Sequence, residues 1–420
     1  QDRRPRRARG RAQDVRHGRP VTTTAAGRSL ALAVADVSWY TTENLFRELD
    51  EPDVSLLAMR CMDYVNGWRK GVYPWSASCR LNREQPRLWT RDLVLPPGWM
   101  KRFPDPGMRP IASTVRRFWK LEGDARRGLV TTYPHYLHLM NRLDPDVSLY
   151  YNLDDYALYW PGRADEIRDL ERRLVAKSSA TVCVSRLRTE ELRRAVPEAA
   201  GRIHHIPHGT PRAFLADRPL DRPGAPPADL AHLPRPLLGY VGTLEDRLDW
   251  ELLDRLSLEF PDASIVIVGR PPEARSSSWF ERCSRFLARP NVHAVGWRPQ
   301  ADLPRYYQAF DLNLIPYLID HPFNRACSPT KINDGMGSTR PIVATSLPEC
   351  RLYDQLFDVV DTHDAFIEAV NAVLKRGSDD GRAADRHAWA RSHACAAVAA
   401  RVVATLDSGG PAGGAPPDRA

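Results

Sequence analysis

The chain has 420 residues, of which 43% are hydrophobic and 27% are charged, and this length and composition are typical of a globular protein with two domains. No run of about 18 apolar residues occurs, so the sequence predicts no membrane-spanning helix. Its seven cysteines are scattered, without a CxxC pair or a paired metal-ligand spacing, which favours a reducing cytoplasm and argues against a cysteine-bound metal.

The two ends of the chain are predicted to be disordered. Residues 1–28 contain nine Arg against two Asp, so they hold most of the formal net charge of +8 and leave the rest of the chain near neutral. No specific nucleic-acid partner is therefore expected. The basic segment is expected to contact anionic lipid, which would place a cytoplasmic protein at the inner face of the plasma membrane. An extension without function explains the same composition equally well. Residues 407–420 are low in complexity.

Residues 29–210 alternate short apolar runs with amphipathic segments, and they are predicted to form the first domain. This alternation is typical of βαβ units and predicts a parallel, doubly wound sheet with right-handed crossovers. Strands are predicted at 29–37, 54–59, 88–95, 128–132, 147–151, 181–184 and 202–206, and helices at 42–49, 112–121, 164–176 and 187–195.

Residues 211–236, rich in Pro, Ala and Asp, are predicted to be a linker. A second α/β pattern follows at 237–382, and residues 383–406 are predicted to form one last helix that packs back on the first domain. Two Rossmann-like domains should face each other across a cleft, with ligands bound at the carboxyl ends of their strands. The predicted strands of the second domain are 237–242, 263–269, 292–295, 312–316, 342–344 and 359–360, and its helices are 246–260, 277–287, 301–309 and 364–375.

The most informative segment runs from Cys327 to Thr345. It is predicted to form a loop, a short helix that starts at Pro329, a glycine stop at Gly337 and a buried strand. A helix N-terminus beside Lys331 makes an anion site, and diphosphate is the anion most often held in this way. Only six of the 60 basic residues are Lys, so a retained ammonium is suggestive, although an ordinary solvated Lys is equally compatible with the pattern.

Three predicted strands of the second domain end in glycine, at Gly242, Gly269 and Gly296. A glycine at one strand end usually marks a simple turn, but three on one sheet edge allow a ligand to approach the backbone. Arg247 and Arg270 would add positive charge beside them. The sequence has neither G-x-G-x-x-G nor G-x-x-x-x-G-K-[ST], which excludes the usual dinucleotide fingerprint and the P-loop.

In the first domain, Asp154 and Asp155 follow a predicted buried strand. One of them could act as a base or bind substrate hydroxyls, or both could cap the next turn. No metal site is expected, because His135 and His138 share a helix face without a third ligand.

With these residues in place, the chain resembles the GT-B glycosyltransferases of the family 4 type (group 1), and is similar to those of teichuronic-acid and exopolysaccharide biosynthesis. The resemblance covers residues 29–406. It is carried by 238–247, 264–269, 292–316 and Ser328-Pro-Thr-Lys331-Ile-Asn-Asp334, which matches the family's P-x-K-x-x-E element, and by 151–156 and 206–209, which resemble its D-D-Y/F and I-P-N-G segments.

The resemblance implies a metal-independent, retaining hexosyltransferase that uses a nucleotide-diphosphate sugar and no cofactor. Lys331 would bind the donor diphosphate, and Asp334 would replace the glutamate that binds ribose. The acceptor would be a glycan or a lipid-linked glycan. The expected catalytic residues are Asp155, Arg247 and Lys331, and the expected donor-binding residues are Gly242, Thr243, Gly269, Arg270, Gly296, Ser328, Thr330, Lys331 and Asp334.

Two positions depart from the family pattern. Asp334 is one methylene shorter than glutamate, and Ala326 stands where the first acid of the family's E-x7-E pattern would fall. Beside the leading hypothesis of a glycosyltransferase in exopolysaccharide or cell-envelope glycan synthesis, two alternatives therefore remain open. One is a non-catalytic GT-B-like binding protein, and the other is a GT-B sugar-nucleotide epimerase.

Overall fold

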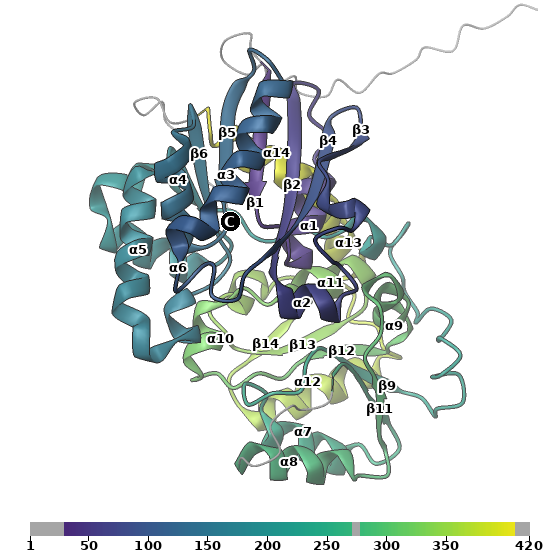
Figure 1. The fold of residues 1–420 in the computed structure, drawn as a ribbon. Helices are drawn as coiled ribbons and strands as arrows, with labels where there is room; N and C mark the ends of the chain where they lie inside the picture. Colours follow the sequence, from purple (N-terminus) through teal and green to yellow (C-terminus); the bar gives the residue numbers. More distant parts are fainter. Residues whose placement is uncertain (1–28, 271–277, 408–420) are drawn as a thin grey trace, which may run out of the picture.

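The computed structural model describes residues 29–270 and 278–407, and the predictions for residues 1–28 and 408–420 lie outside these ranges. The described chain forms two α/β domains stacked one above the other (Figure 1). The expectation of two doubly wound sheets that face a cleft is confirmed. No helix within the described ranges is long and apolar enough to cross a membrane.

The first domain has an eight-stranded sheet in the order β3-β4-β2-β1-β5-β6-β7-β8. The paired strands run parallel except β3 and β4, which are antiparallel at the sheet edge. The strands are β1 (Leu30–Ala35), β2 (Val54–Asp63), β3 (Asn82–Gln85), β4 (Leu88–Leu95), β5 (Arg126–Thr131), β6 (Val147–Asn152), β7 (Ala180–Cys183) and β8 (Ile203–His205), and the helices are α1 (Tyr40–Arg47), α2 (Tyr64–Arg69), α3 (Pro104–Leu121), α4 (Leu137–Leu143), α5 (Ala164–Lys177) and α6 (Arg186–Ala195).

The second domain has a six-stranded parallel sheet in the order β11-β10-β9-β12-β13-β14. Its strands are β9 (Leu237–Val241), β10 (Ser264–Val268), β11 (Val292–Gly296), β12 (Leu312–Ile315), β13 (Ile342–Thr345) and β14 (Asp358–Val360). Its helices and those that follow are α7 (Trp250–Glu259), α8 (Ser278–Leu287), α9 (Leu303–Ala309), α10 (Pro322–Ala326), α11 (Thr330–Ser338), α12 (His363–Lys375), α13 (Ala383–Ser392) and α14 (Cys395–Ala404).

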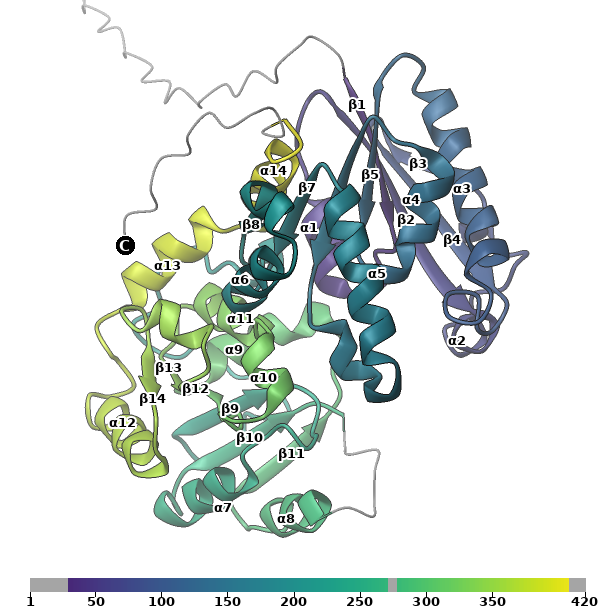
Figure 2. The same ribbon diagram turned by 90° about the vertical axis from the view of Figure 1, so that its left-hand side faces the viewer.

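Strand β1 shows why the first sheet is buried on both faces. Side chains alternate between the faces of a strand. Ala31, Ala33 and Ala35 join the core under α3, α4 and α5, whereas Leu32 and Val34 join the core under α1 and α14. Figure 2 shows helices on both sides of this sheet. A strand covered on both faces reads as a continuous apolar run, which is why the sequence identifies it.

The last helix is two helices, not the single one expected over 383–406. The break falls at His393 and Ala394, where the backbone pairs with Thr210: the Thr210 N–H donates to the carbonyl of His393 (2.7 Å), and the Cys395 N–H donates to the carbonyl of Thr210 (2.9 Å). Helix α13 packs on α11 of the second domain, whereas α14 packs on α1 and the first sheet. The chain thus crosses between the domains a second time at this break.

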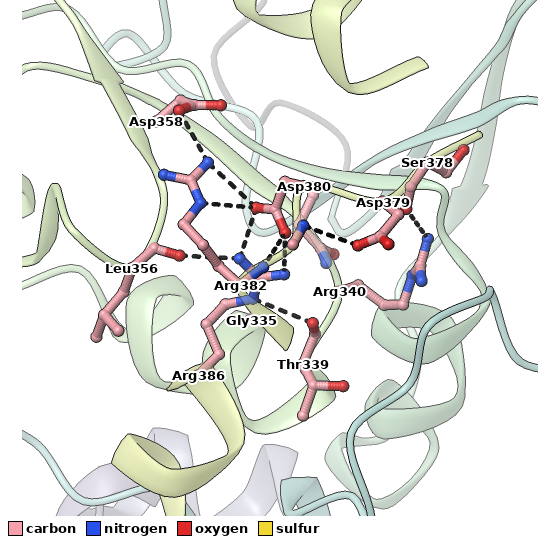
Figure 3. Close-up of polar contacts among 12 residues, drawn as sticks. Gly335, Thr339, Arg340, Leu356, Asp358, Ser378, Asp379, Asp380, Arg382 and Arg386 are labelled. Atoms are coloured by element: carbon pink, nitrogen blue, oxygen red, sulfur yellow. Dashed lines mark hydrogen bonds and ion pairs between the residues drawn. The ribbon is translucent and has the colours of Figure 1, made fainter. Parts of the chain in front are cut away.

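Two fully buried arginines fix the loop that follows α11 (Figure 3). Arg386 donates to both carboxylate oxygens of Asp380 (2.6 and 2.7 Å) and to the carbonyl of Thr339 (3.0 Å). Arg340 donates to the carbonyls of Phe310 (3.1 Å) and Ser378 (2.7 Å). Burial of Asp380 is the largest single influence and opposes its ionisation, but the hydrogen bonds and charges of Arg386 and Arg382 together outweigh burial and lower its pKa. The two arginines therefore supply hydrogen-bond donors to backbone carbonyls that are buried in the fold.

Replacing Arg386→Met should lower the free energy of unfolding by about 3–5 kcal/mol, because it leaves the buried Asp380 carboxylate without its main partner. Urea denaturation monitored by circular dichroism measures this change. Arg305→Met, which removes the exposed ion pair with Asp302, should cost at most about 1 kcal/mol. Equal effects of the two substitutions would contradict a central role for the buried pair.

Candidate functional site

A cavity of about 680 Å³ opens between the carboxyl ends of the second sheet and residues 38–40 and Lys70 of the first domain. Most residues expected to bind a donor line it. These are Gly242, Thr243, Gly269, Arg270, Thr330, Lys331 and Asp334, and the expected catalytic residue Arg247 lines the cavity with them.

The glycines at the ends of β9, β10 and β11 lie against one another, as their positions predict. The Gly242 N–H donates to the carbonyl of Val268 (2.9 Å), and the Gly269 N–H donates to the carbonyl of Gly296 (3.1 Å). A Cβ at Gly269 would lie 1.8 Å from the Gly242 carbonyl oxygen, so no larger residue fits. Bare backbone therefore forms one wall of the cavity, whereas Gly296 stands behind it and does not line the cavity.

Lys331 lies in the first turn of α11, and its side chain crosses this glycine wall. Its Nζ donates to the hydroxyl of Tyr317 (2.7 Å) and lies 5.2 Å from the ring centroid of Tyr240. A Cβ at Gly242 would lie 2.7 Å from Nζ. In the part of the chain that the structure describes, no carboxylate pairs with Lys331 within 4.0 Å. Its charge is oriented by tyrosines and is not neutralised by a protein acid.

Asp334 follows Lys331 by three residues, so both side chains lie on one face of α11. Asp334 is buried, and burial raises its pKa to about 7 although Lys331 opposes the shift. Across the cleft, the Tyr40 hydroxyl of the first domain donates to Thr330 Oγ1 (2.7 Å). The start of α11 is thus tied to both domains.

Arg247 and Arg270 hold their charges beside aromatic rings. The Arg247 guanidinium lies 4.3 Å from the Phe323 ring centroid and pairs with Glu245. The Arg270 guanidinium lies 5.6 Å from the ring centroid of Trp297, an exposed residue that also lines the cavity. Sequence analysis missed Trp297, although it directly follows the third glycine.

A smaller cavity of about 220 Å³ shares Arg247, Thr330 and Lys331 with the larger one. Ser328 lines only this smaller cavity. So does Asp154, which accepts a hydrogen bond from the Tyr159 hydroxyl (2.9 Å) at one oxygen. The other oxygen, Oδ1, is shielded from solvent and has no hydrogen-bond partner. Burial raises the pKa of Asp154 to about 6, against the opposing effects of Tyr159 and Arg247.

The expectation for Asp155 has to be corrected, because its side chain lies outside both cavities. It accepts a hydrogen bond from the Ala157 N–H (3.1 Å) and so caps the turn at Tyr156–Tyr159. Its other oxygen lies 3.9 Å from Arg188. Capping was the alternative that the sequence left open. The turn sends the two neighbouring carboxylates apart, and the one at the cavity is Asp154.

The sequence predicted that Gly337 stops the helix, and this prediction is wrong. Helix α11 continues to Ser338 and ends at Thr339, which has a left-handed φ of 62°. Gly337 instead permits close packing: a Cβ there would lie 2.7 Å from the Phe214 carbonyl oxygen, and its own carbonyl accepts from the Ala216 N–H (2.9 Å).

A second contact between the domains, which sequence analysis did not identify, involves Glu349. This buried carboxylate accepts from the Arg186 N–H (3.0 Å) at the start of α6 and lies 3.2 Å from Nε2 of His205. It follows β13 of the second domain, so its contacts with Arg186 and His205 join the two domains. Among the residues with described positions, no group of three His, Cys, Asp or Glu is arranged to hold a metal ion.

Comparisons with known proteins agree with this geometry. Residues 235–376 match the family described as "Glycosyl transferases group 1". The chain is 23% identical over 224 residues to the candidate teichuronic acid biosynthesis glycosyltransferase TuaH of Bacillus subtilis (strain 168), a match that covers 52% of this chain and 54% of TuaH. The chain therefore spans about half the length of this relative.

Solved structures share the whole architecture. Sucrose-phosphate synthase from Thermosynechococcus elongatus superposes with a TM-score of 0.66 at 14% identity, over 90% of this chain and 98% of that one. Anabaena Alr3699/HepE in complex with UDP gives a TM-score of 0.60 at 12% identity, over 91% and 100%. Trehalose-phosphate synthase (UDP-forming) from Burkholderia vietnamiensis gives 0.65 at 12%, over 91% and 98%. The chain thus has the GT-B fold.

Asp334 should make stability depend on pH in an unusual direction. The pKa of Asp334 is about 7 in the folded protein and 3.8 in the reference state. Its contribution to the free energy of unfolding is therefore most favourable below pH 4, where the carboxyl is neutral in both states, and is lost as the pH rises through 7. Asp334→Asn should therefore stabilise the fold, by an amount that grows by at most about 4 kcal/mol between pH 4 and pH 8.

Thermal and urea unfolding over this pH range measure the effect. Asp165→Asn, at a fully exposed carboxylate, is the control and should show no such trend. If the difference between Asp334→Asn and the original protein does not change with pH, Asp334 is ionised in the folded protein and this account of its environment is wrong.

Proposed function

We propose that this protein, whose residues 235–376 match the group 1 glycosyltransferases, transfers a sugar from a nucleotide-diphosphate sugar to a hydroxyl of a glycan or lipid-linked acceptor. The observation that carries the proposal is the unneutralised ammonium of Lys331 at the start of α11, on the glycine wall of the 680 Å³ cavity. Helix N-termini with an adjacent cation bind phosphate groups, and the volume lies within the range of small-molecule sites.

In the bound donor, the diphosphate lies between the first turn of α11 and the backbone at Gly242. Asp334 accepts hydrogen bonds from ribose hydroxyls, and its raised pKa falls when a ligand donates to its carboxylate. Trp297, beside Arg270, offers a flat exposed surface for the base. The structure of Anabaena Alr3699/HepE with UDP-glucose, at 13% identity and a TM-score of 0.59, shows a nucleotide sugar bound by a protein of this fold.

In the transfer step, the bond between the sugar's anomeric carbon and the diphosphate oxygen breaks, and the acceptor oxygen forms a new bond to that carbon. The negative charge that develops on the leaving diphosphate is stabilised by Lys331, Arg247 and the positive end of the α11 dipole. These cations support a reaction that needs no metal ion. In line with the family resemblance, we expect the anomeric configuration to be retained.

Asp154 replaces Asp155 in this proposal as the acid of the acceptor side. Asp154 lines the small cavity that meets the large one at Lys331, and its Oδ1 has no hydrogen-bond partner among the described residues. An acceptor hydroxyl placed there would pass its proton to the Asp154 carboxylate as its oxygen bonds to the anomeric carbon of the donor sugar. The carboxylate form is required for this role.

The similarity to TuaH, which is named for teichuronic acid biosynthesis, favours a role in the synthesis of an envelope or exported glycan. The alternative of a non-catalytic binding protein draws on Ala326, which is buried in α10 and offers no acid. Analysis of the reaction products distinguishes the three functions. Transfer of the sugar to an acceptor supports the glycosyltransferase, and conversion of the donor without an acceptor supports an epimerase. Binding of the donor without turnover supports the binding protein.

Lys331→Ala should weaken binding of the nucleotide-diphosphate sugar at least about tenfold, because the variant loses a charge-assisted contact to the diphosphate. Isothermal titration calorimetry with UDP-, GDP- and ADP-sugars measures it. Lys375→Ala, at the exposed end of α12, should bind like the original protein. Unchanged affinity in Lys331→Ala would overturn the donor site, and absence of binding by the original protein to any of these sugars would overturn the proposed function.

The transfer rate should fall as the pH drops through about 6, because Asp154 becomes protonated there. Asp154→Asn should be slower by roughly 10²-fold and should lack this acid limb. Asp155→Asn should keep the limb, because Asp155 lies outside the cavity. Initial rates of nucleotide release with a fixed acceptor, measured from pH 5 to pH 9, test both variants. An acid limb that persists in Asp154→Asn would assign it to another group.

A further inference from the structure

The first domain carries a cluster of exposed aromatic side chains beside the cleft. Trp75 is 78% exposed, Trp68 is 70% exposed and Phe103 is 59% exposed, and Tyr64 and Val65 are exposed with them. Tyr73 stacks on Trp75 at 5.2 Å between ring centroids. These side chains belong to residues 64–80 and 96–104, which we call the aromatic face.

The fold gathers the aromatic face from two segments that leave neighbouring strands at the same end. Asp63, the last residue of β2, pairs in register with Leu95, the last residue of β4. Helix α2 covers the end of β4, where a Cβ at Gly67 would lie 3.2 Å from Val94. Figure 2 shows α2 projecting from the lower corner of the first domain, clear of the second domain.

The aromatic face is also strongly basic. Its two segments contain five cations and not one Asp or Glu, although the chain outside residues 1–28 is close to neutral. No ion pair within 4.0 Å involves these cations among the described residues, although Lys101 Nζ lies 3.4 Å from the ring centroid of Trp160. Other exposed arginines do pair, such as Arg127 with Asp146 and Arg163 with Glu166. The cations are Arg69, Lys70, Arg80, Lys101 and Arg102.

The surface of an anionic lipid bilayer suits both the exposed tryptophans and the cations beside them. Aromatic side chains with polar atoms favour the headgroup layer of a bilayer, and clustered Lys and Arg are attracted to anionic lipids. Water solvates the cations equally well but not the rings. A neutral glycan could stack on the rings but would not require a cluster of cations without acidic partners.

We propose that the aromatic face docks on the surface of an anionic lipid bilayer. The inference extends the proposed function, because Lys70 of this face also lines the 680 Å³ cavity. A docked bilayer would therefore lie at the mouth of the cleft, where a lipid-linked acceptor is presented. Docking itself does not require transfer, so the two proposals can fail separately.

The full-length protein is incubated with vesicles of phosphatidylcholine and phosphatidylglycerol at a ratio of 7:3, and with vesicles of phosphatidylcholine alone, and the bound fraction is measured by flotation. We expect binding to the anionic vesicles that weakens with salt and with omission of phosphatidylglycerol. The double variant Trp68→Ser/Trp75→Ser should bind at least about tenfold more weakly. Leu258→Ser, at a residue 56% exposed on the second domain, should bind like the original protein.

Arg80→Gln/Arg102→Gln provides a second variant pair that keeps every ring and every cavity residue, and it too should reduce binding. Undiminished binding by both pairs would overturn docking through this face, as would equal binding to neutral vesicles. Calorimetry with the nucleotide sugars separates the two proposals. Sugar binding without vesicle binding overturns docking alone, and vesicle binding without sugar binding overturns the proposed function while docking stands.

Discussion

Helix α11 is held in place by contacts at both of its ends and along its side. The cavity depends on these contacts, because the first turn of α11 forms part of its wall. At its C-terminal end, the buried Arg386 binds the carbonyl of Thr339. Along its side, Gly337 allows the segment that connects the domains to pack within contact distance. At its N-terminal end, Thr330 Oγ1 accepts a hydrogen bond from the hydroxyl of Tyr40 in the first domain. A helix of nine residues has little stability of its own, so its position comes from these contacts.

The same arrangement concentrates unfavourable electrostatics at the cleft. Lys331 has no acidic partner among the residues that the structure describes, and Asp334 and Asp154 are carboxyls whose burial raises their pKa. Such groups destabilise a fold unless a ligand supplies their partners, and perturbed groups in a cleft are typical of functional sites. The buried Arg386–Asp380 pair, which lies outside the cleft, is fully hydrogen-bonded instead. The contrast supports a ligand site at α11 and a structural role for the arginines behind it.

What could be predicted from the sequence depended on how local the determining contacts are. All strands of both sheets except β3 follow from apolar runs. The approach of Gly242 and Gly269 follows because parallel strands end at the same sheet edge, and the family resemblance placed Lys331 beside them. Strand β3 was missed because an edge strand such as Asn82–Gln85 is polar. The division of the last helix was missed because it depends on pairing between Thr210 and Ala394, far apart in the chain.

The site shows the same limit. Asp154 and Asp155 are chemically identical, and only the direction of one turn decides which of them reaches the cavity. The role of Gly337 depends on Phe214, a residue more than 100 positions away. Asp334 could be recognised from its spacing to Lys331, but its burial could not.

The most direct test of a diphosphate site built on α11 is amide hydrogen exchange with and without saturating UDP, GDP or ADP. We expect one of these ligands to slow exchange at residues 330–334, 242–243 and 269–270 together. These segments come from separate parts of the chain and meet only at the cavity. Protection confined to other segments, or no protection with any of the three nucleotides, would contradict the account.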